Sequence, residues 1–385
     1  MTTAAQQLSI VDAGTSESSS GHRLTQIDGL RAIAALSVVA FHYTTRFDQV
    51  FHHVAPTGFE LPLGYLGVNL FFAISGFVIY LTLDGIRAPL DFVISRFSRL
   101  FPTYWIAVAL TWSIVAIVGL PGYGVTWKEA FINLTMLQSF FSVRDVDSVY
   151  WSLQVELLFY VWMLVLWVLG LLRHSAAICV GWVAIAGAAT FVEIVLGMKV
   201  SFALKHFLLL EWIPWFVLGM IAYVTLRERT FGLKYGSAVV VAIAAIAARN
   251  NTPSTILAVA VFGIVWAASR RKLRLLEWKP LVFFGMISYP LYLVHEQIGW
   301  IIITKVEAQL AAPWIAILAA LFFVTVLATL LHKLIETPGS RNIRKIYKKS
   351  TYAASMLNFN RARWAFGGLI SILAFAAAFV ISARL

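Results

Sequence analysis

Two ionisable side chains lie on one apolar segment near the N-terminus. Arg31 and His42 are eleven residues apart in IDGLRAIAALSVVAFHY. In a helix, eleven residues make three turns plus about 20°, so both side chains share one face, roughly 16 Å apart along the axis. Imidazole is the usual general base near neutral pH. The spacing therefore predicts a helix with a cation at one end and a catalytic base, His42, at the other. The alternative is a snorkelling arginine and a histidine bonded within a helix bundle.

Two further arginines, Arg96 and Arg99, are three residues apart in RFSRLFPTYW, and a helix start there turns both the same way. Two converging guanidinium groups can clamp phosphate groups bidentately. The pair is therefore a candidate site for a phosphate-bearing ligand. The alternative is the ordinary flanking of a membrane span by basic residues.

A polar stripe runs along the segment VYWSLQVELLFY, where Ser152, Glu156 and Tyr160 recur every four residues. A glutamate within a membrane must pair with a partner or face a cavity. We expect Glu156 to hold His42 in one tautomer or to raise its basicity. The alternative is a structural hydrogen bond between helices.

A second polar face occurs in ISYPLYLVH, where Ser288, Tyr292 and His295 lie within two helical turns. Pro290 removes one backbone hydrogen bond, which membrane helices tolerate where they line a cavity. Ser288, Tyr292 and His295 are therefore candidates for contacting a substrate or for stabilising an oxyanion. A purely structural role is the alternative for His295.

The composition shows which elements must hold these side chains. The chain has 385 residues, of which 60% are hydrophobic and 12% are charged. The charged share is about half that of a soluble domain, so the sequence predicts an integral membrane protein that crosses the bilayer several times. This composition excludes a disordered protein and a nucleic-acid binder, and the single Cys179 excludes a disulfide scaffold. No metal-binding motif and no nucleotide-binding glycine loop is present, so no metal is expected.

Eleven apolar segments have the length that a membrane-spanning helix needs. They are 27–46, 64–84, 101–120, 149–172, 176–197, 206–226, 232–248, 254–269, 281–303, 313–335 and 364–383. The stretch 128–141 is too short and polar to cross and is expected at an interface. Residues 1–22 have the composition of a disordered tail.

The distribution of basic residues predicts the orientation. With the N-terminus in the cytoplasm, 22 of the 30 Lys and Arg residues fall at the cytoplasmic side. Cytoplasmic loops of membrane proteins carry such an excess, so the net charge of +12 mostly reports topology. In this orientation Arg31, Arg96 and Arg99 lie toward the cytoplasm, whereas the His and Glu residues lie toward the outer side. The arrangement suits a protein that takes up an anionic molecule from the cytoplasm and carries out acid–base chemistry further out.

Several of these segments resemble the acyltransferase 3 family of bacterial membrane O-acyltransferases. IDGLRAIAALSVVAFHY resembles the family's first helix, whose signature is Arg or Lys, ten residues and then His. GYLGVNLFFAISGFVIYLTL, FVISRFSRLFPTYW, YWSLQVELLFY, ISYPLYLVH and IETP resemble further family blocks, in the family's order. The resemblance covers about residues 24–345. Asn69 stands where many members have Asp.

The resemblance implies an all-α integral membrane protein with a ten-helix acyltransferase domain at 23–345. A basic cytoplasmic linker and an extra C-terminal transmembrane helix would then occupy 346–385, as in a stand-alone member without an appended esterase-like domain. It also implies transfer of an acyl group, usually acetyl, from cytoplasmic acyl-CoA to a hydroxyl of a carbohydrate or glycolipid acceptor at the outer side of a bacterial inner membrane. No nucleic acid is expected as a partner, and the sequence leaves the oligomeric state open.

By motif position, the resemblance makes His42 the catalytic residue and Arg31 its partner. Arg96 and Arg99 would bind the CoA phosphates, and Ser75 of the second helix is assigned to the same donor site. His42 would act either as a general base or as a residue that is itself acylated. A competing interpretation is a proton-coupled transporter of an organic anion. Such transporters often contain two symmetry-related halves, and the sequence has no second copy of the Arg-x10-His helix.

Overall fold

The computed structural model describes residues 24–249 and 252–349, and every regular element within these ranges is a helix. The predicted all-α fold is thus confirmed. In chain order the helices are α2 (Thr25–Phe41), η2 (His42–Arg46), α3 (Phe47–Phe51), η3 (Gly64–Leu66), α4 (Gly67–Gly85), α5 (Pro89–Val118), α6 (Trp127–Asn133), η4 (Gln138–Phe141), η5 (Ser148–Tyr150), α7 (Trp151–Val168), η6 (Leu171–His174), α8 (Ser175–Ile194), α9 (Phe202–Phe207), α10 (Ile213–Arg227), α11 (Leu233–Arg249), α12 (Thr252–Ser269), η7 (Arg274–Glu277), α13 (Lys279–Met286), α14 (Ser288–Val294), α15 (Glu296–Leu310), α16 (Pro313–Leu331), η8 (His332–Glu336) and α17 (Thr337–Lys349). Of the η elements, η2 and η8 are π-helices and the others are 3₁₀ turns.

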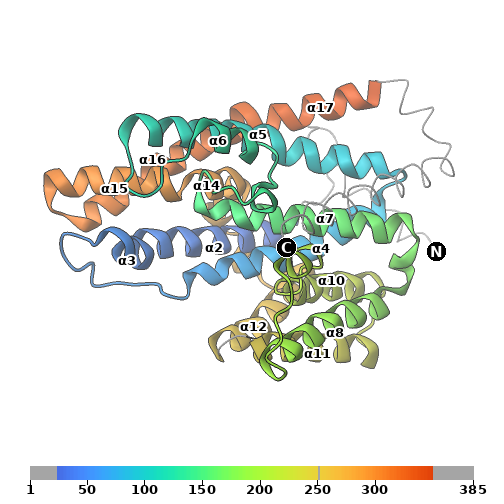
Figure 1. Ribbon diagram of the computed structural model, residues 1–385. Coiled ribbons are helices and arrows are strands. Elements are labelled where there is room, and N and C mark those ends of the chain that lie inside the picture. Colours follow the sequence, from blue (N-terminus) through green and yellow to red (C-terminus); the bar gives the residue numbers. More distant parts are fainter. Residues whose placement is uncertain (1–23, 250–251, 350–385) are drawn as a thin grey trace.

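The helices form a main bundle with a smaller group at its side. In Figure 1, α2, α4, α5, α7, α15 and α16 run roughly along one direction, and α8, α10, α11 and α12 gather below them. The contacts of α10 with α4, and of α12 with α2, join the smaller group to the bundle. All of the sequence-predicted site residues lie in the main bundle.

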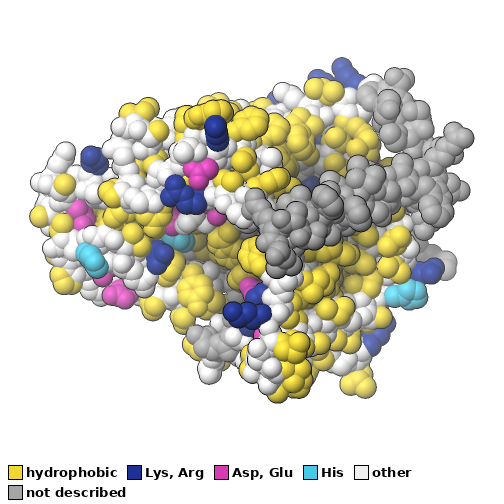
Figure 2. All heavy atoms as spheres, in the orientation of Figure 1, with side chains coloured by type: hydrophobic (Ala, Val, Ile, Leu, Met, Phe, Trp, Pro, Cys, Tyr) yellow, Lys and Arg dark blue, Asp and Glu magenta, His cyan; other side chains and the backbone are white. Residues whose placement is uncertain are grey.

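The surface is that of a membrane protein. Within residues 24–249 and 252–349, six helices are long and apolar enough to cross a bilayer, and Ile213–Arg227 is a shorter apolar helix. Hydrophobic side chains cover much of the face seen in Figure 2. On α16, for example, Phe322 and Phe323 are 67% and 64% exposed, which water would disfavour and lipid would not. The protein is therefore a multi-pass membrane protein. The predicted count of ten spans is not confirmed by these six helices and stays a prediction.

Other predictions fall on the termini. The tail at 1–22, the last span at 364–383 and almost all of the segment 346–385 lie outside the described residues. The stretch 128–141 contains all but the first residue of the seven-residue α6, and a 3₁₀ turn. Seven helical residues rise only about 10 Å, so this segment is too short to cross the bilayer on its own.

The span predicted at 101–120 begins earlier in the structure. Helix α5 starts at Pro89, whose fixed backbone angle suits a first helical position. The Asp91 carboxylate accepts a hydrogen bond from the Ala88 backbone N–H and closes this end. The first turns of α5 are polar, so apolar content alone does not predict that they belong to the helix. As a result Arg96 and Arg99 lie inside a long helix instead of before it.

The span predicted at 281–303 is divided into α13, α14 and α15. Its first break, at Ile287, lies three residues before Pro290. Proline has no N–H to donate and its ring clashes with the carbonyl four residues earlier, which explains a break at this point. The second junction, at His295, separates α14 from α15 and places a candidate site residue between two helices.

Helix α10 packs very closely on α4. A Cβ atom at Gly219 would overlap the Ala73 carbonyl oxygen, and one at Gly76 would overlap the Phe216 carbonyl. Small residues let two membrane helices approach this closely and gain dispersion contacts. The two glycines therefore fix how the smaller helix group attaches to the main bundle.

We expect Gly219→Ala to destabilise the fold by at least about 1–3 kcal/mol, because α4 and α10 must separate to accept the methyl group. The measurement is thermal unfolding of the detergent-solubilised protein. Gly181→Ala on α8 is the matched control, since a Cβ atom there meets open space. Equal melting temperatures for the two variants would contradict this account of the α4–α10 contact.

Candidate active site

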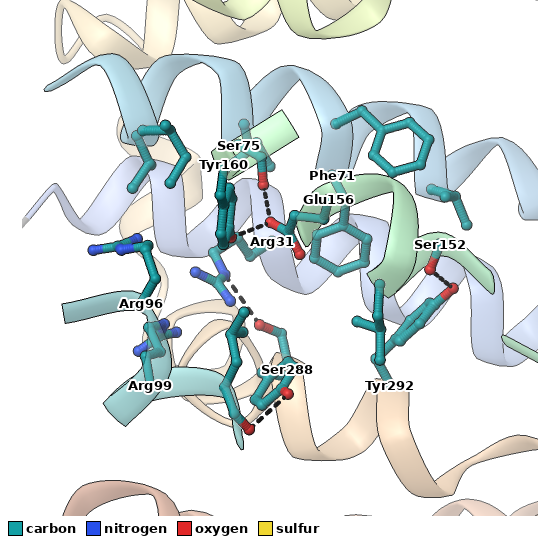
Figure 3. Close-up of a pocket in the computed structure, with 18 residues that line it drawn as sticks. Arg31, Phe71, Ser75, Arg96, Arg99, Ser152, Glu156, Tyr160, Ser288 and Tyr292 are labelled. Carbon is teal, nitrogen blue, oxygen red and sulfur yellow. Dashed lines mark hydrogen bonds between the residues drawn. The ribbon is translucent and has the colours of Figure 1, made fainter. Parts of the chain in front are cut away.

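Seven of the nine sequence-predicted site residues line one cavity. They come from α2, α4, α5, α7 and α14 and are Arg31, Ser75, Arg96, Arg99, Glu156, Ser288 and Tyr292. Figure 3 shows Arg96 and Arg99 at one side of this cavity and Ser152 with Tyr292 at the opposite side. His42 and His295 are not among its lining residues. We call the cavity the arginine pocket and the surroundings of His42 the histidine site.

The arginine pocket has an excess of cationic groups. Arg99 pairs with Glu336 at 3.3 Å, and Glu336 also contacts His332 at 2.7 Å. Arg31 and Arg96 are instead bonded to serine hydroxyls, Arg31 to Ser288 and Arg96 to the neighbouring serine. The Nε of Arg96 is buried and has no hydrogen-bond partner. A buried guanidinium with an unused donor fits an anionic ligand that supplies the missing acceptor.

Ser288 lies beside Arg31 and not beside His42. Its hydroxyl accepts a hydrogen bond from Arg31 Nε at 3.2 Å and donates one to the Gly285 carbonyl at 2.8 Å. Seven helical residues separate Ser288 from His295, which is about 10 Å along the axis. The prediction that Ser288 stabilises an oxyanion next to His42 is therefore not supported by its position.

Glu156 also differs from its predicted position. Its Oε1 accepts hydrogen bonds from the hydroxyls of Ser75 and Tyr160, the latter at 2.6 Å. These contacts, drawn in Figure 3, hold Glu156 in the arginine pocket, and the predicted pairing of Glu156 with His42 is wrong. Helix α7 explains the difference. Ser152, one turn before Glu156, already contacts Tyr292 at the far side of the pocket, so Glu156 lies closer to the arginines.

His42 and His295 form a buried pair in the histidine site. The Nδ1 of His42 lies 2.8 Å from the Val38 carbonyl and 3.3 Å from His295 Nε2. The Nδ1 of His295 lies 2.9 Å from the Tyr292 carbonyl. A carbonyl only accepts hydrogen bonds, so we assign the proton of each neutral ring to Nδ1. This tautomer leaves the Nε2 lone pair of His42 available as a base.

Glu296 is the carboxylate that the structure brings to His42. Its Oε1 lies 3.7 Å from His42 Nε2, and only 1% of the Glu296 side chain is exposed. The sequence marks Glu296 as ionisable within an apolar segment, directly after His295, but it does not indicate the pairing. Only the crossing of α15 with the end of α2 brings the two side chains together.

The backbone around His42 is held by contacts with α15. His42 begins a π-helical turn that continues α2, a local form often found at functional sites. The Trp300 indole donates a hydrogen bond to the His42 carbonyl at 2.9 Å, and the Tyr43 hydroxyl donates one to the His295 carbonyl at 2.8 Å. A Cβ atom at Gly299 would overlap the Tyr43 hydroxyl, so the glycine makes this approach feasible.

Tyr292 stands between the two sites. It lines the arginine pocket, its hydroxyl bonds with Ser152 at 2.7 Å, and its ring centroid lies 5.6 Å from that of His295. The Phe71 ring lies edge-on to Tyr292, with the two ring centroids 5.9 Å apart. The arginine pocket therefore extends toward the histidine site, and Tyr292 separates the two.

The family model described as an acyltransferase domain matches residues 24–333. The chain belongs to the acyltransferase 3 family. The matched range contains all nine predicted site residues and Glu296, whereas Glu336, the partner of Arg99, lies just beyond it.

Curated relatives match parts of this acyltransferase family chain. An exopolysaccharide production protein of Rhizobium meliloti (strain 1021) is 30% identical over 29% of the chain and 37% of its own length. An acyltransferase of Streptomyces mycarofaciens is 31% identical over 36% of the chain and 38% of its own length. The chain thus spans well under half the length of these relatives. No solved structure matches it at a significant level.

We expect a cysteine at Ser75 to react with a small thiol reagent, because Ser75 lines the arginine pocket and is partly exposed within it. The measurement is the labelling rate of Ser75→Cys in a Cys179→Ala background, which removes the buried native thiol. Thr103→Cys on α5 is the control, since Thr103 is fully buried and its hydroxyl has no hydrogen-bond partner. Equal rates at the two positions would argue against an accessible pocket.

Proposed function

We propose that the protein transfers an acyl group, most simply acetyl, from acyl-CoA to a hydroxyl of a carbohydrate or glycolipid acceptor. The observation that carries this proposal is that α2 and its continuation at His42 connect two different chemical environments. Arg31 contributes to a cationic pocket, and His42, on the same helix, belongs to a separate site with a free imidazole nitrogen. A donor that carries phosphates and an acceptor that must lose a proton need these two environments.

The arginine pocket suits the phosphates of acyl-CoA. Arg31, Arg96 and Arg99 surround it, and guanidinium groups bind phosphate oxygens with paired hydrogen bonds. The unused Nε of Arg96 provides a donor for such a ligand. Phe71 and other apolar side chains line the wall toward Tyr292, which suits a pantetheine arm whose thioester points at the histidine site.

His42 supplies the base that acyl transfer needs. In direct transfer, Nε2 takes the proton of the acceptor hydroxyl while the oxygen attacks the thioester carbonyl. The new C–O bond forms, the C–S bond breaks, and the proton passes from His42 to the departing thiolate. In the alternative, His42 attacks first and carries the acyl group to the acceptor. A labelled acyl-enzyme formed without acceptor would favour the second route.

We infer that the arginine pocket opens to the cytoplasm of a bacterial cell and that the acceptor binds at the outer side of the inner membrane. The excess of basic residues at the predicted cytoplasmic side supports this orientation. The name of the Rhizobium relative refers to exopolysaccharide production, which supports a carbohydrate acceptor. The lipid bilayer completes the set of proposed partners.

We expect His42→Ala to lower kcat by at least about 10²–10⁴-fold, the usual contribution of a general base. The assay follows thiol release from acetyl-CoA by the purified protein with a surface-glycan acceptor. His206→Ala is the control, because His206 is only half-buried and lies outside both sites. Full activity of His42→Ala would end the mechanism, and uptake of an organic anion into vesicles without thiol release would favour transport instead.

We expect Arg96→Ala and Arg99→Ala to raise the KM for acetyl-CoA while changing the rate with a short acetyl thioester that lacks phosphates much less. The reason is that the guanidinium groups would bind the phosphates and not the reacting carbonyl. The measurement is the KM of each variant for both donors, with the exposed Arg173→Ala as the control. An unchanged KM for acetyl-CoA would reassign Arg96 and Arg99 to membrane topology.

A further inference from the structure

A second buried carboxyl group lies behind the one that faces His42. Asp147 is fully buried, shares a hydrogen bond with Glu296, and accepts a hydrogen bond from the Gln297 backbone N–H at 3.3 Å. The Ser148 hydroxyl lies 2.6 and 2.5 Å from the two carboxyl oxygens of Glu296. Glu296 thus joins His42, Ser148 and Asp147 in one buried polar cluster.

Electrostatic repulsion limits the protonation states that the two carboxyl groups, Glu296 and Asp147, can adopt together. Two carboxylates in contact within an apolar interior cannot both stay ionised, so the pair shares one proton. The Ser148 hydroxyl has a single proton and can donate it to only one oxygen of Glu296. The proton on Asp147 can then form the hydrogen bond between the two carboxyl groups. This distribution leaves Glu296 as the anion next to His42.

The other charged groups around His42 and Glu296 lie farther away. Arg46 lies on the same π-helical turn as His42 and acts on it through longer-range electrostatics. Asp145, two residues before Asp147, interacts with Glu296 in the same way. His295 contacts His42 at Nδ1, the side opposite to Glu296. Among the described residues, Glu296 is therefore the carboxylate at ion-pair distance from His42.

We propose that Glu296 is a positioning residue that acts through His42, with Asp147 as the neutral acid that keeps Glu296 ionised. This inference rests on the proposed function. When His42 takes the hydroxyl proton of the acceptor, Nε2 becomes cationic 3.7 Å from Glu296, which stabilises the imidazolium until its proton passes to the departing thiolate. No atom is gained or lost by Glu296 or Asp147 during the reaction.

The same helix provides a matched structural comparison. Glu307, eleven residues after Glu296 on α15, contacts His53 at 2.6 Å and accepts a hydrogen bond from the Val54 backbone N–H at 3.1 Å. This pair is also buried, but it ties down the loop after α3 and does not contact His42. A histidine–glutamate pair with a merely structural role is thus present in the same protein.

The test compares Glu296→Gln, Asp147→Asn and Glu307→Gln in the purified full-length protein, with acetyl-CoA and a glycan acceptor. We expect Glu296→Gln to lower kcat by about 10²-fold or more, because removal of one preorganised electrostatic partner typically has this effect. The KM for acetyl-CoA should stay unchanged. The acid limb of the pH–rate profile should move to lower pH, since the imidazolium loses its anion. Glu296→Asp should restore part of the rate.

The two carboxamide variants distinguish the position of the shared proton. If Asp147 is neutral, Asp147→Asn keeps most of the rate. If Asp147→Asn loses the rate and Glu296→Gln keeps it, the assignment of the anion is overturned. Glu307→Gln should lower the melting temperature without moving the pH–rate profile.

Two outcomes separate this inference from the function on which it rests. A wild-type protein that turns over no acyl thioester contradicts the proposed function and removes the basis for the role of Glu296. An active wild-type protein with Glu296→Gln equal to it in kcat and pH–rate profile overturns the role of Glu296 alone.

Discussion

The cost of burying charge in an apolar interior controls the arrangement of this protein. A charged side chain within a membrane protein must find a partner or face a cavity, and two clusters in the main bundle meet this requirement. At one end, Arg99 pairs with Glu336 while Arg31 and Arg96 face the arginine pocket. At the other end, Glu296 lies against His42 and Asp147. Both clusters hold polar groups in defined positions, and a catalyst needs such preorganisation.

Close helix packing makes these clusters feasible. Gly219 and Gly76 bring α10 against α4, and Gly299 lets the Tyr43 hydroxyl reach the His295 carbonyl. A hydrogen bond from Trp300 then fixes the carbonyl of His42 itself. The irregular turns follow the same logic. The π-helical turn at His42 and the break near Pro290 place side chains where a regular helix would not, and neighbouring helices satisfy the local backbone.

Particular residues show how far the sequence could predict the site. Helix geometry predicts from the eleven-residue spacing that Arg31 and His42 share one helix face. The structure places one residue in each site. Arg96 and Arg99 line the same cavity as Arg31, in a longer helix than predicted, and their binding of phosphates stays a prediction. Glu156 contacts Ser75 and Tyr160 instead of His42, and Ser288 lies beside Arg31. Periodicity gives the face of a helix but neither its height relative to the next helix nor the neighbour that the face meets.

The sequence by itself determined the class of protein, the all-α fold, the acyltransferase 3 family motifs and the residues able to do chemistry, because composition and helical period are local properties of the chain. Tertiary structure alone decided which ionisable groups pair. Glu296 reaches His42 across 254 positions of sequence, and Glu156 instead meets Ser75. Pairing depends on how helices cross and slide against one another, and these depend on the packing of many side chains at once.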